Sequence, residues 1–217
     1  MNNLTKRILT SIVLLCLIYF SMVNALFLLL FLIVIFFLTI KEINLIYKQI
    51  FNKNFFFVFI ANFLSVIYLS IFLIIIWIYL GFSEIDKTVT LIFILSICVL
   101  TDIGGFVFGK LIGGKKLTKI SPNKTYSGMF GSFIFSLIFG YLFYYFQRDI
   151  LVFKINILLI IIIVSSLSQF GDLIISLFKR KAKIKDTGSI LPGHGGILDR
   201  IDGILIAIPF GIILISL

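Results

Sequence analysis

The sequence predicts an all-α, polytopic helical membrane protein with about seven transmembrane helices. Of the 217 residues, 61% are hydrophobic, well above the roughly 45–50% of a soluble domain. Several uncharged stretches reach about 20 residues, the length that crosses a hydrocarbon core about 30 Å thick. Because lipid offers no hydrogen bonds to an exposed backbone, such stretches are expected to fold as helices.

Seven apolar segments are the expected spans. The first two are adjacent in sequence, which favours a tight hairpin, and the last is short, so that a start nearer Arg200 is an alternative. We assign residues 1–80 to an anchoring region and residues 81–217 to a catalytic region. The expected spans cover residues 8–23, 25–40, 55–80, 88–109, 128–147, 155–175 and 204–217.

The positive charges predict the orientation. If the N-terminus lies inside and the spans alternate, only Lys87, Arg148 and Lys154 of the 19 basic residues fall outside, as the positive-inside rule requires. We therefore expect the N-terminus and the active site on the cytoplasmic side of the cell (inner) membrane. The net charge of +10 is weak evidence for nucleic acid, and we expect no nucleic-acid partner.

Two carboxylates fall at the inner ends of apolar segments. Asp102 is followed by Gly104 and Gly105, which allow close backbone approach, and Asp172 follows Gly171. Ionisable residues at membrane depth usually face a bundle interior or a wet cavity and serve function. The alternative is a carboxylate that pairs with lysine for packing. Two carboxylates near one face suit Mg²⁺, but the sequence does not show that they converge.

The loop after Asp102, residues 109–128, alternates basic residues with glycines and hydroxyls. Backbone amides, Ser121, Thr125 and lysines such as Lys124 could surround phosphates there. The loop lacks the P-loop spacing. The alternative is a positive-inside loop that contacts anionic lipid headgroups.

The strongest signal lies just before the last apolar segment. A basic cluster and a Pro-Gly-His-Gly-Gly turn precede Asp199 and Asp202, whose i, i+3 spacing places both carboxylates on one helix face. Arg200 between them could balance the acids or hold a phosphate oxygen, which suits a metal clamp. His194, the only histidine, could donate to a phosphate or act as a base, or it could be structural.

These residues carry a family resemblance. The pattern S-x-x-K-R-x₄-K-D-x-G…P-G-H-G-G-x-x-D-R-x-D, which begins at Ser176, resembles the signature of the CTP:phosphatidate cytidylyltransferases. The DIGGF and SPNKT segments resemble further family motifs in the expected order. The likeness is strong over residues 101–202 and loose over the N-terminal spans.

The resemblance implies an enzyme that makes CDP-diacylglycerol and pyrophosphate from CTP and phosphatidic acid. It also implies a metal cofactor, expected to be Mg²⁺ with a second cation possible, and a homodimer in membrane lipid. The implied residues are Asp186, Asp199, Arg200, His194 and Lys185 for catalysis, Ser121, Lys124, Thr125, Lys179 and Arg180 for substrate binding, and Asp102, Asp172, Asp199 and Asp202 for the metal.

Two alternatives remain open at this point. A cytidylyltransferase that acts on a different lipid phosphate would carry the same motifs. A cation transporter would spread its acids through the bilayer midplane, whereas five of the nine acids here gather near one face beside lysines and arginines. The pattern of the CDP-alcohol phosphotransferases is absent from the sequence.

Overall fold

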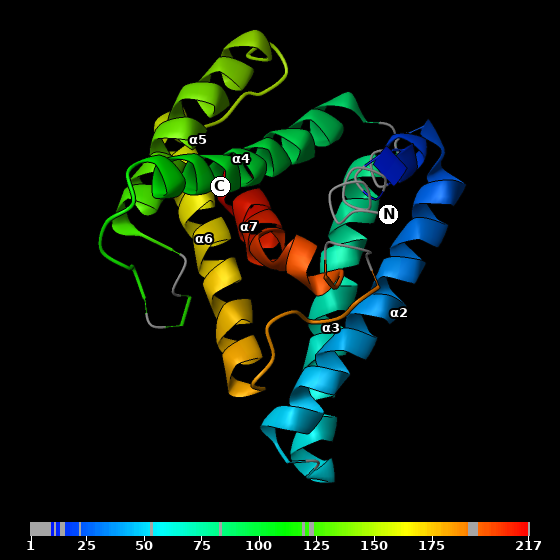
Figure 1. Ribbon diagram of the computed structural model, residues 1–217. Helices are drawn as coiled ribbons and strands as arrows, with labels where there is room; N and C mark the ends of the chain where they lie inside the picture. The colour runs from blue at the N-terminus through cyan, green and yellow to red at the C-terminus, as the bar shows by residue number, and fades with distance from the viewer. Residues whose placement is uncertain are drawn as a thin grey trace. The chain divides into compact units, whose positions relative to one another are not determined.

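The computed structural model is helical, and no strand occurs among the residues that it describes (Figure 1). The predicted all-α class is therefore confirmed. The described residues are 10, 12–13, 16–21, 23–52, 54–82, 84–118, 120–121, 124–190 and 195–216.

Five of the helices in these ranges are long and apolar enough to cross a membrane, by length and composition. They correspond to the second to sixth predicted spans, whereas the first predicted span, residues 8–23, lies only partly within the described residues. The bounds are α2 (Ala25–Ile50), α3 (Phe55–Leu80), α4 (Ile85–Leu111), α5 (Tyr126–Phe146), α6 (Ile157–Lys181) and the shorter α7 (Leu198–Ser216).

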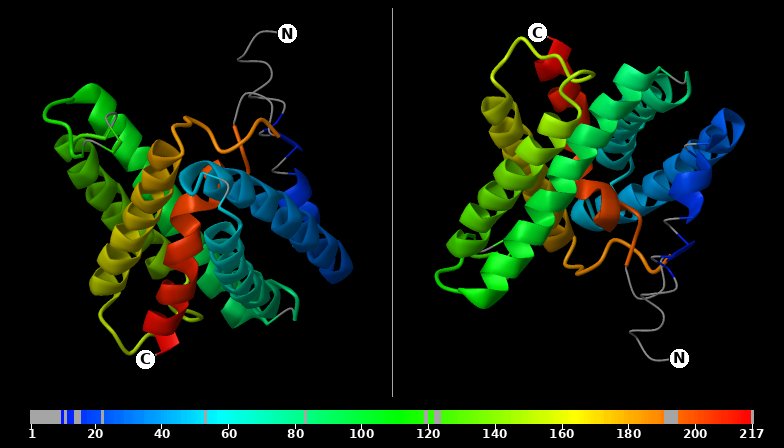
Figure 2. Two further views of the ribbon diagram at one scale, coloured as in Figure 1. Left: turned by 90° about the horizontal axis from the view of Figure 1, so that it is seen from below. Right: turned by 90° about the horizontal axis from the view of Figure 1, so that it is seen from above.

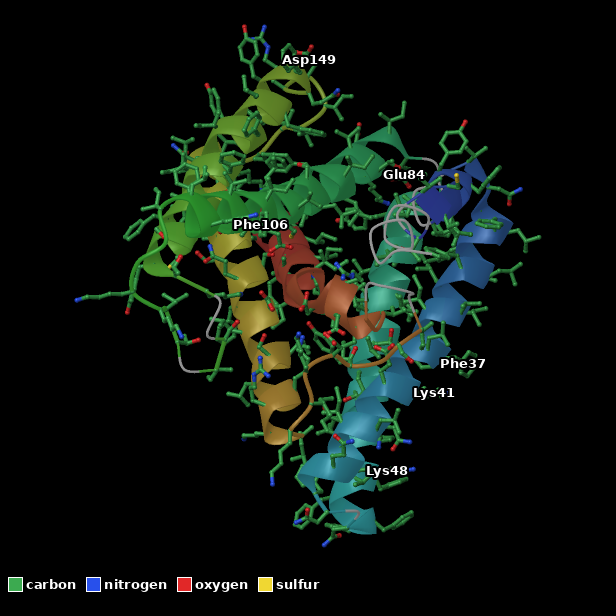
Figure 3. All side chains as sticks on the ribbon, in the orientation of Figure 1. Phe37, Lys41, Lys48, Glu84, Phe106 and Asp149 are labelled. Carbon is green, nitrogen blue, oxygen red and sulfur yellow. The ribbon has the colours of Figure 1, made fainter. Side chains whose placement is uncertain are left out.

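Helices α2, α6 and α7 extend clearly beyond their predicted bounds, and α6 does so by continuing to Lys181 instead of ending at residue 175. Helix α2 continues to Ile50 instead of ending at residue 40, because the chain becomes amphipathic there without leaving the helix. Along this extension Glu42 and Ile46 are buried, while Lys41 and Lys48 are exposed (Figure 3). Helix α7 begins at Leu198, ahead of the predicted residue 204 and near the alternative start at Arg200.

Side-chain caps fix several helix starts. The Asn24 side chain accepts from the Phe27 amide at 3.2 Å before α2, and the Asn54 side chain accepts from the Phe56 amide at 3.2 Å before α3. Asparagine and threonine are favoured N-caps because they satisfy amides that have no partner inside the helix. Thr125 does the same for α5.

The chain divides into two compact units. The first comprises Met1–Ser83 and Phe178–Ile201, and the second comprises Glu84–Leu177 and Asp202–Leu217. Helices α6 and α7 therefore each contribute residues to both units. The assignment of residues 1–80 to anchoring and residues 81–217 to catalysis stays a prediction.

In the first unit, α2 and α3 lie side by side (Figure 1). Polar pairs join the two helices: Tyr47 Oη lies 3.0 Å from Ser65 Oγ, and Asn62 Nδ2 donates to Asn44 Oδ1 at 3.1 Å. Hydrogen bonds between helices are a main source of specificity where water is absent. The Tyr47 ring also meets the Phe178 ring edge to face, with centroids 6.1 Å apart.

In the second unit, α4 and α5 lie side by side (Figure 2). They approach closely because glycines of the two helices face each other. A Cβ on Gly104 would lie 2.5 Å from the carbonyl oxygen of Gly131, and a Cβ on Gly128 would lie 2.8 Å from the carbonyl oxygen of Gly105. Small residues let helix backbones approach in this way. The close approach expected at Gly104 and Gly105 is confirmed.

We expect Gly104→Ala to lower the free energy of unfolding by about 1–3 kcal/mol, because its methyl group would meet rigid backbone. Gly140→Ala in α5 is the matched control, since its Cβ would first meet the flexible end of Ile161 at 3.3 Å. It should be neutral, or stabilising by up to about 1 kcal/mol. Thermal unfolding in detergent measures both, and equal effects would contradict the packing described.

Candidate functional site

The second unit contains a pocket of about 330 Å³. Residues from α4, the α4–α5 loop, α5 and α6 line it, and both carboxylates that the sequence singled out in apolar segments are among them. The lining residues are Thr101, Asp102, Gly105, Phe106, Leu117, Ser121, Lys124, Thr125, Gly128, Met129, Ser132, Gln169 and Asp172.

An ion pair lies within this pocket. The ammonium of Lys124 pairs with Asp172 Oδ2, and the two side chains are 29% and 27% exposed. The other oxygen of Asp172 accepts a hydrogen bond from Ser176 Oγ at 3.3 Å. Asp102 is exposed on the wall formed by α4. The pocket thus presents two carboxylates and one cation that is accessible to a ligand.

The turn geometry of the α4–α5 loop, residues 112–125, brings its polar residues to the pocket. Gly113 and Gly114 have φ values of 64° and 105°, which favour glycine. The loop then folds back on itself: the Leu117 amide donates to Lys124 O at 2.8 Å and the Tyr126 amide donates to Lys115 O at 3.1 Å.

Thr125 has a structural task beside its place in the pocket wall. Its Oγ1 accepts from the Gly128 amide at 3.1 Å and lies 2.9 Å from Ser127 Oγ. Ser127 Oγ in turn donates to the carbonyl of Gly113. Thr125 therefore fixes the start of α5 at the pocket, and the predicted role in substrate binding stays a prediction.

Hydroxyl groups join the helices on the deep side of the pocket. Ser132 Oγ of α5 donates to Thr101 O of α4 at 2.7 Å, and Thr101 Oγ1 lies 2.8 Å from Ser165 Oγ of α6. Thr101 is fully buried. These contacts hold the α4 turn that carries Asp102 against the two neighbouring helices.

A second polar cluster lies in the first unit, around Asp199. Lys179 Nζ pairs with Asp199 Oδ1 at 2.7 Å, which joins a predicted substrate-binding residue to a predicted catalytic and metal residue. Asp199 Oδ2 accepts from the amides of Thr187 at 2.8 Å and Gly196 at 3.1 Å. The contacts of this carboxylate with the described residues thus serve to order the segment before α7.

Burial of the Asp199 carboxyl by itself would raise its pKa. The hydrogen bonds from Lys179 and from the amides of Thr187 and Gly196, together with the charge of Lys179, outweigh burial and hold the pKa below its ordinary value. Asp199 is therefore a carboxylate that the fold keeps ionised.

Sequence reasoning missed Glu42 as a member of this cluster. Its carboxylate is 1% exposed and accepts from Thr187 Oγ1 at 2.8 Å, from the Ile197 amide at 3.0 Å and from the Leu198 amide at 2.9 Å. The length of the second predicted span could have revealed it, because residues 25–40 are fewer than the roughly 20 residues that a spanning helix needs. A second span of about 20 residues from the same start would have included Glu42 as an acid at membrane depth.

The end of α6 positions Lys179. The Ile184 amide donates to Lys179 O at 3.0 Å and the Lys183 amide donates to Arg180 O at 3.0 Å, with Lys183 at φ 57°. This is the Schellman arrangement, in which the residue in the left-handed region is usually glycine. It turns the chain sharply after the basic cluster and back toward Asp199.

The remaining predicted residues are placed in both units. Asp202 lies on α7 in the second unit, where its Oδ1 accepts from the Gly203 amide at 2.9 Å. A Cβ on Gly171 would lie 2.6 Å from the Asp202 carbonyl oxygen, so α6 passes close to this turn. His194 lies outside the described residues. Four others are exposed in the first unit: Arg180, Lys185, Asp186 and Arg200.

Within the described part of the chain, no group of three or more His, Cys, Asp or Glu side chains could hold a metal ion. The predicted metal ligands Asp102 and Asp172 line one pocket, whereas Asp199 belongs to the cluster of the first unit. Any metal in the pocket would need further ligands from substrate or water.

Comparison with known proteins gives a consistent result. A family model described as the cytidylyltransferase family matches residues 5–217. Similar curated proteins are named phosphatidate cytidylyltransferase. Those of Staphylococcus haemolyticus, Bacillus subtilis and Haemophilus influenzae are 48%, 41% and 36% identical over 114, 131 and 124 residues.

The matched regions cover 51%, 58% and 55% of this chain, but only 42%, 48% and 43% of the respective relatives. The chain thus matches a little under half of the length of each of these proteins.

Asp199→Asn should destabilise the protein at pH 7 by about 1–3 kcal/mol, because several donors lose an ionised partner. Since the folded pKa lies below the ordinary value, this stability is present above about pH 4 and is lost as the pH falls through the folded pKa. The gap between wild type and variant should therefore shrink in acid. Thermal unfolding in detergent between pH 7 and pH 3 measures it.

The control for this series is Asp149→Asn, at an exposed carboxylate after α5 (Figure 3). We expect it to unfold like the wild type at neutral pH. A gap between wild type and Asp199→Asn that stays constant down to pH 3 would contradict the assignment of the stability to the ionised carboxylate.

Proposed function

This chain belongs to the cytidylyltransferase family, and from that premise we propose that it transfers a cytidylyl group from CTP to phosphatidic acid. The products are CDP-diacylglycerol and pyrophosphate, which would serve phospholipid biosynthesis. The relatives named phosphatidate cytidylyltransferase support the choice of substrates. The observation that carries the proposal is the pocket of the second unit, where Asp102, Asp172 and Lys124 come together beside hydroxyls and the start of α5.

In the proposed reaction an oxygen of the phosphatidate phosphate attacks the α-phosphorus of CTP. The bond from that phosphorus to the oxygen bridging to the β-phosphate breaks, and pyrophosphate leaves with the electron pair. The nucleophile is already an anion, so no covalent enzyme intermediate is needed. The main barrier is the approach of two polyanions, which positioning and charge neutralisation lower.

Lys124 is the residue of this pocket that we assign to a substrate phosphate. Its ammonium has three donors, of which the ion pair with Asp172 uses one. The Ser121 hydroxyl adds a neutral donor at the same wall. These groups would orient the phosphates of the nucleotide or of the lipid.

We propose Mg²⁺ as the cofactor, with a second cation possible. The donor set fits this ion, because Mg²⁺ takes one or two protein carboxylates together with substrate phosphates and water, and Asp102 and Asp172 line one pocket. When bound, Mg²⁺ neutralises charge on the phosphates. Asp199 and Asp202 stay predicted ligands, and Asp186, Lys185, Arg200 and His194 stay predicted catalytic residues.

We further propose that the pocket opens to the cytoplasm at the inner membrane and that the protein is a homodimer. The distribution of lysine and arginine along the chain supports the orientation. The dimer rests on the family resemblance. Five of the nine acids gather near one predicted face of the membrane instead of spreading through the midplane, which weighs against the alternative of cation transport.

Purified protein in detergent should convert radiolabelled CTP into a lipid-extractable product only when CTP, phosphatidic acid and Mg²⁺ are all present. Chelation with EDTA should abolish the product, and excess Mg²⁺ should restore it. A folded sample that makes no product beside an active positive control would overturn the proposal. Product with a different lipid phosphate alone would redirect it.

Asp172→Asn should lower the rate by about 100-fold or more, because the pocket loses a charge that binds the metal and orients Lys124. Asp149→Asn, outside the pocket, should keep the wild-type rate. The same CTP assay measures both variants, with thermal unfolding as a check on folding. A fully active Asp172→Asn would remove the pocket from the proposed mechanism.

A further inference from the structure

We infer that Glu42 is a positioning residue for the enzyme: it holds Asp199 and the start of α7 in place through Thr187. Among the described residues, three donors contact its carboxylate, and all three belong to the segment that precedes and begins α7. The nearest of these residues in sequence is 145 positions from Glu42. The expected effect on kcat rests on the proposed function, whereas the expected effect on the start of α7 rests on geometry alone.

The first step of the argument concerns the helix start. Ile197 and Leu198 lie at the N-terminus of α7, where backbone amides have no partner within the helix. Glu42 Oε1 accepts from the first amide and Oε2 from the second. A carboxylate on α2 thus caps α7. Its negative charge also interacts favourably with the positive end of the α7 helix dipole.

The second step links Glu42 to Asp199. Thr187 is 4% exposed, and its Oγ1 lies 2.8 Å from Glu42 Oε2 and 3.1 Å from Asp199 Oδ2. A hydroxyl has one proton, and the shorter distance assigns it to Glu42. The Thr187 amide then donates to Asp199 Oδ2 at 2.8 Å, which leaves Oδ1 for Lys179 at 2.7 Å.

The third step is that the backbone leaves room for this carboxylate. A Cβ on Gly188 would lie 2.8 Å from Glu42 Oε1, and a Cβ on Gly196 would overlap Thr187 Oγ1 and the Glu42 carboxylate. Two glycines of the segment therefore meet the same buried group. A side chain that served only to fill space would not need three oriented donors, and burial of a charge is costly unless it is fully hydrogen-bonded.

The test compares Glu42→Gln with Glu84→Gln. Glu84 is the only other glutamate of the chain, and it is exposed at the start of α4 with Lys87 as its partner (Figure 3). In Glu42→Gln the new NH₂ group would replace one acceptor oxygen. It would then face the hydroxyl or amide donors that contact Glu42 in the wild type. We expect this variant to speed hydrogen exchange in a peptide that contains Ile197 and Leu198 by about tenfold or more. Peptides from α5 should exchange as in the wild type.

The kinetic measurement uses the CTP assay on the same preparations. We expect kcat of Glu42→Gln to fall about tenfold or more, with KM for CTP changed by less than about threefold, because pre-organisation is lost while binding groups remain. Glu84→Gln should match the wild type in exchange and in rate. A general loss of folding would instead speed exchange in every peptide.

Thr187 supplies an independent pair of variants. Thr187→Val keeps the shape and removes the hydroxyl, so it should lower kcat as Glu42→Gln does, and Thr187→Ser should stay near the wild type. Since the two residues act as one unit, the double variant Glu42→Gln/Thr187→Val should lose little more than the worse single variant. These variants test the positioning role if Glu42→Gln does not fold.

Two results would overturn the inference. One is wild-type exchange of the Ile197 and Leu198 peptide in Glu42→Gln or, if that variant does not fold, wild-type kcat in Thr187→Val. The other is a fall in kcat that matches only the loss of folded protein. If the wild type itself makes no product, the proposed function fails, and the exchange comparison still decides the positioning role.

Discussion

Polar side chains in a chain this apolar must find their partners within the protein, and both units are organised by that constraint. Transfer of an unpaired polar group from water to hydrocarbon costs several kcal/mol. The Glu42 carboxylate, fully enclosed, is surrounded by three donors. In the second unit, the hydroxyls of Thr101 and Ser132 join α4 to its neighbours. In both units, hydrogen bonds between polar side chains thus join segments that lie far apart in the sequence.

The two polar clusters differ in what they leave for a ligand. In the first unit, Asp199 uses both carboxylate oxygens on protein donors. In the second unit, Asp172 and Lys124 are partly exposed in a pocket, and Asp102 lies on its wall. The closed set of hydrogen bonds around Asp199 orders the backbone, whereas the carboxylates and the lysine of the pocket remain accessible to a ligand.

Glycine controls how closely the pocket walls approach. At Gly104 and Gly128 any side chain would meet backbone of the facing helix. The same contact that packs α4 on α5 sets the width of the pocket between Asp102 and the start of α5. The packing of the two helices and the width of the pocket are therefore determined by one helix contact.

The sequence by itself determined the helical membrane class, most spans and the identity of the polar residues near their ends. These features depend on local composition: apolar length makes a span, and asparagine or threonine begins a helix. Local composition was not sufficient at residue 40, where the second predicted span ended although the helix continues to Ile50. The predicted span ended where the chain becomes more polar, so Glu42 fell just outside it.

Only the tertiary structure decided which polar residues are partners. The sequence grouped Asp199 with Asp202 by spacing on one helix, but the contacts of Asp199 run to Lys179, Thr187 and Gly196. Folding brought Asp172 of α6 to Lys124 of the α4–α5 loop, and it brought Glu42 to a residue 145 positions away. Spacing along a helix is a local property, whereas a hydrogen bond between distant segments exists only after the chain has folded.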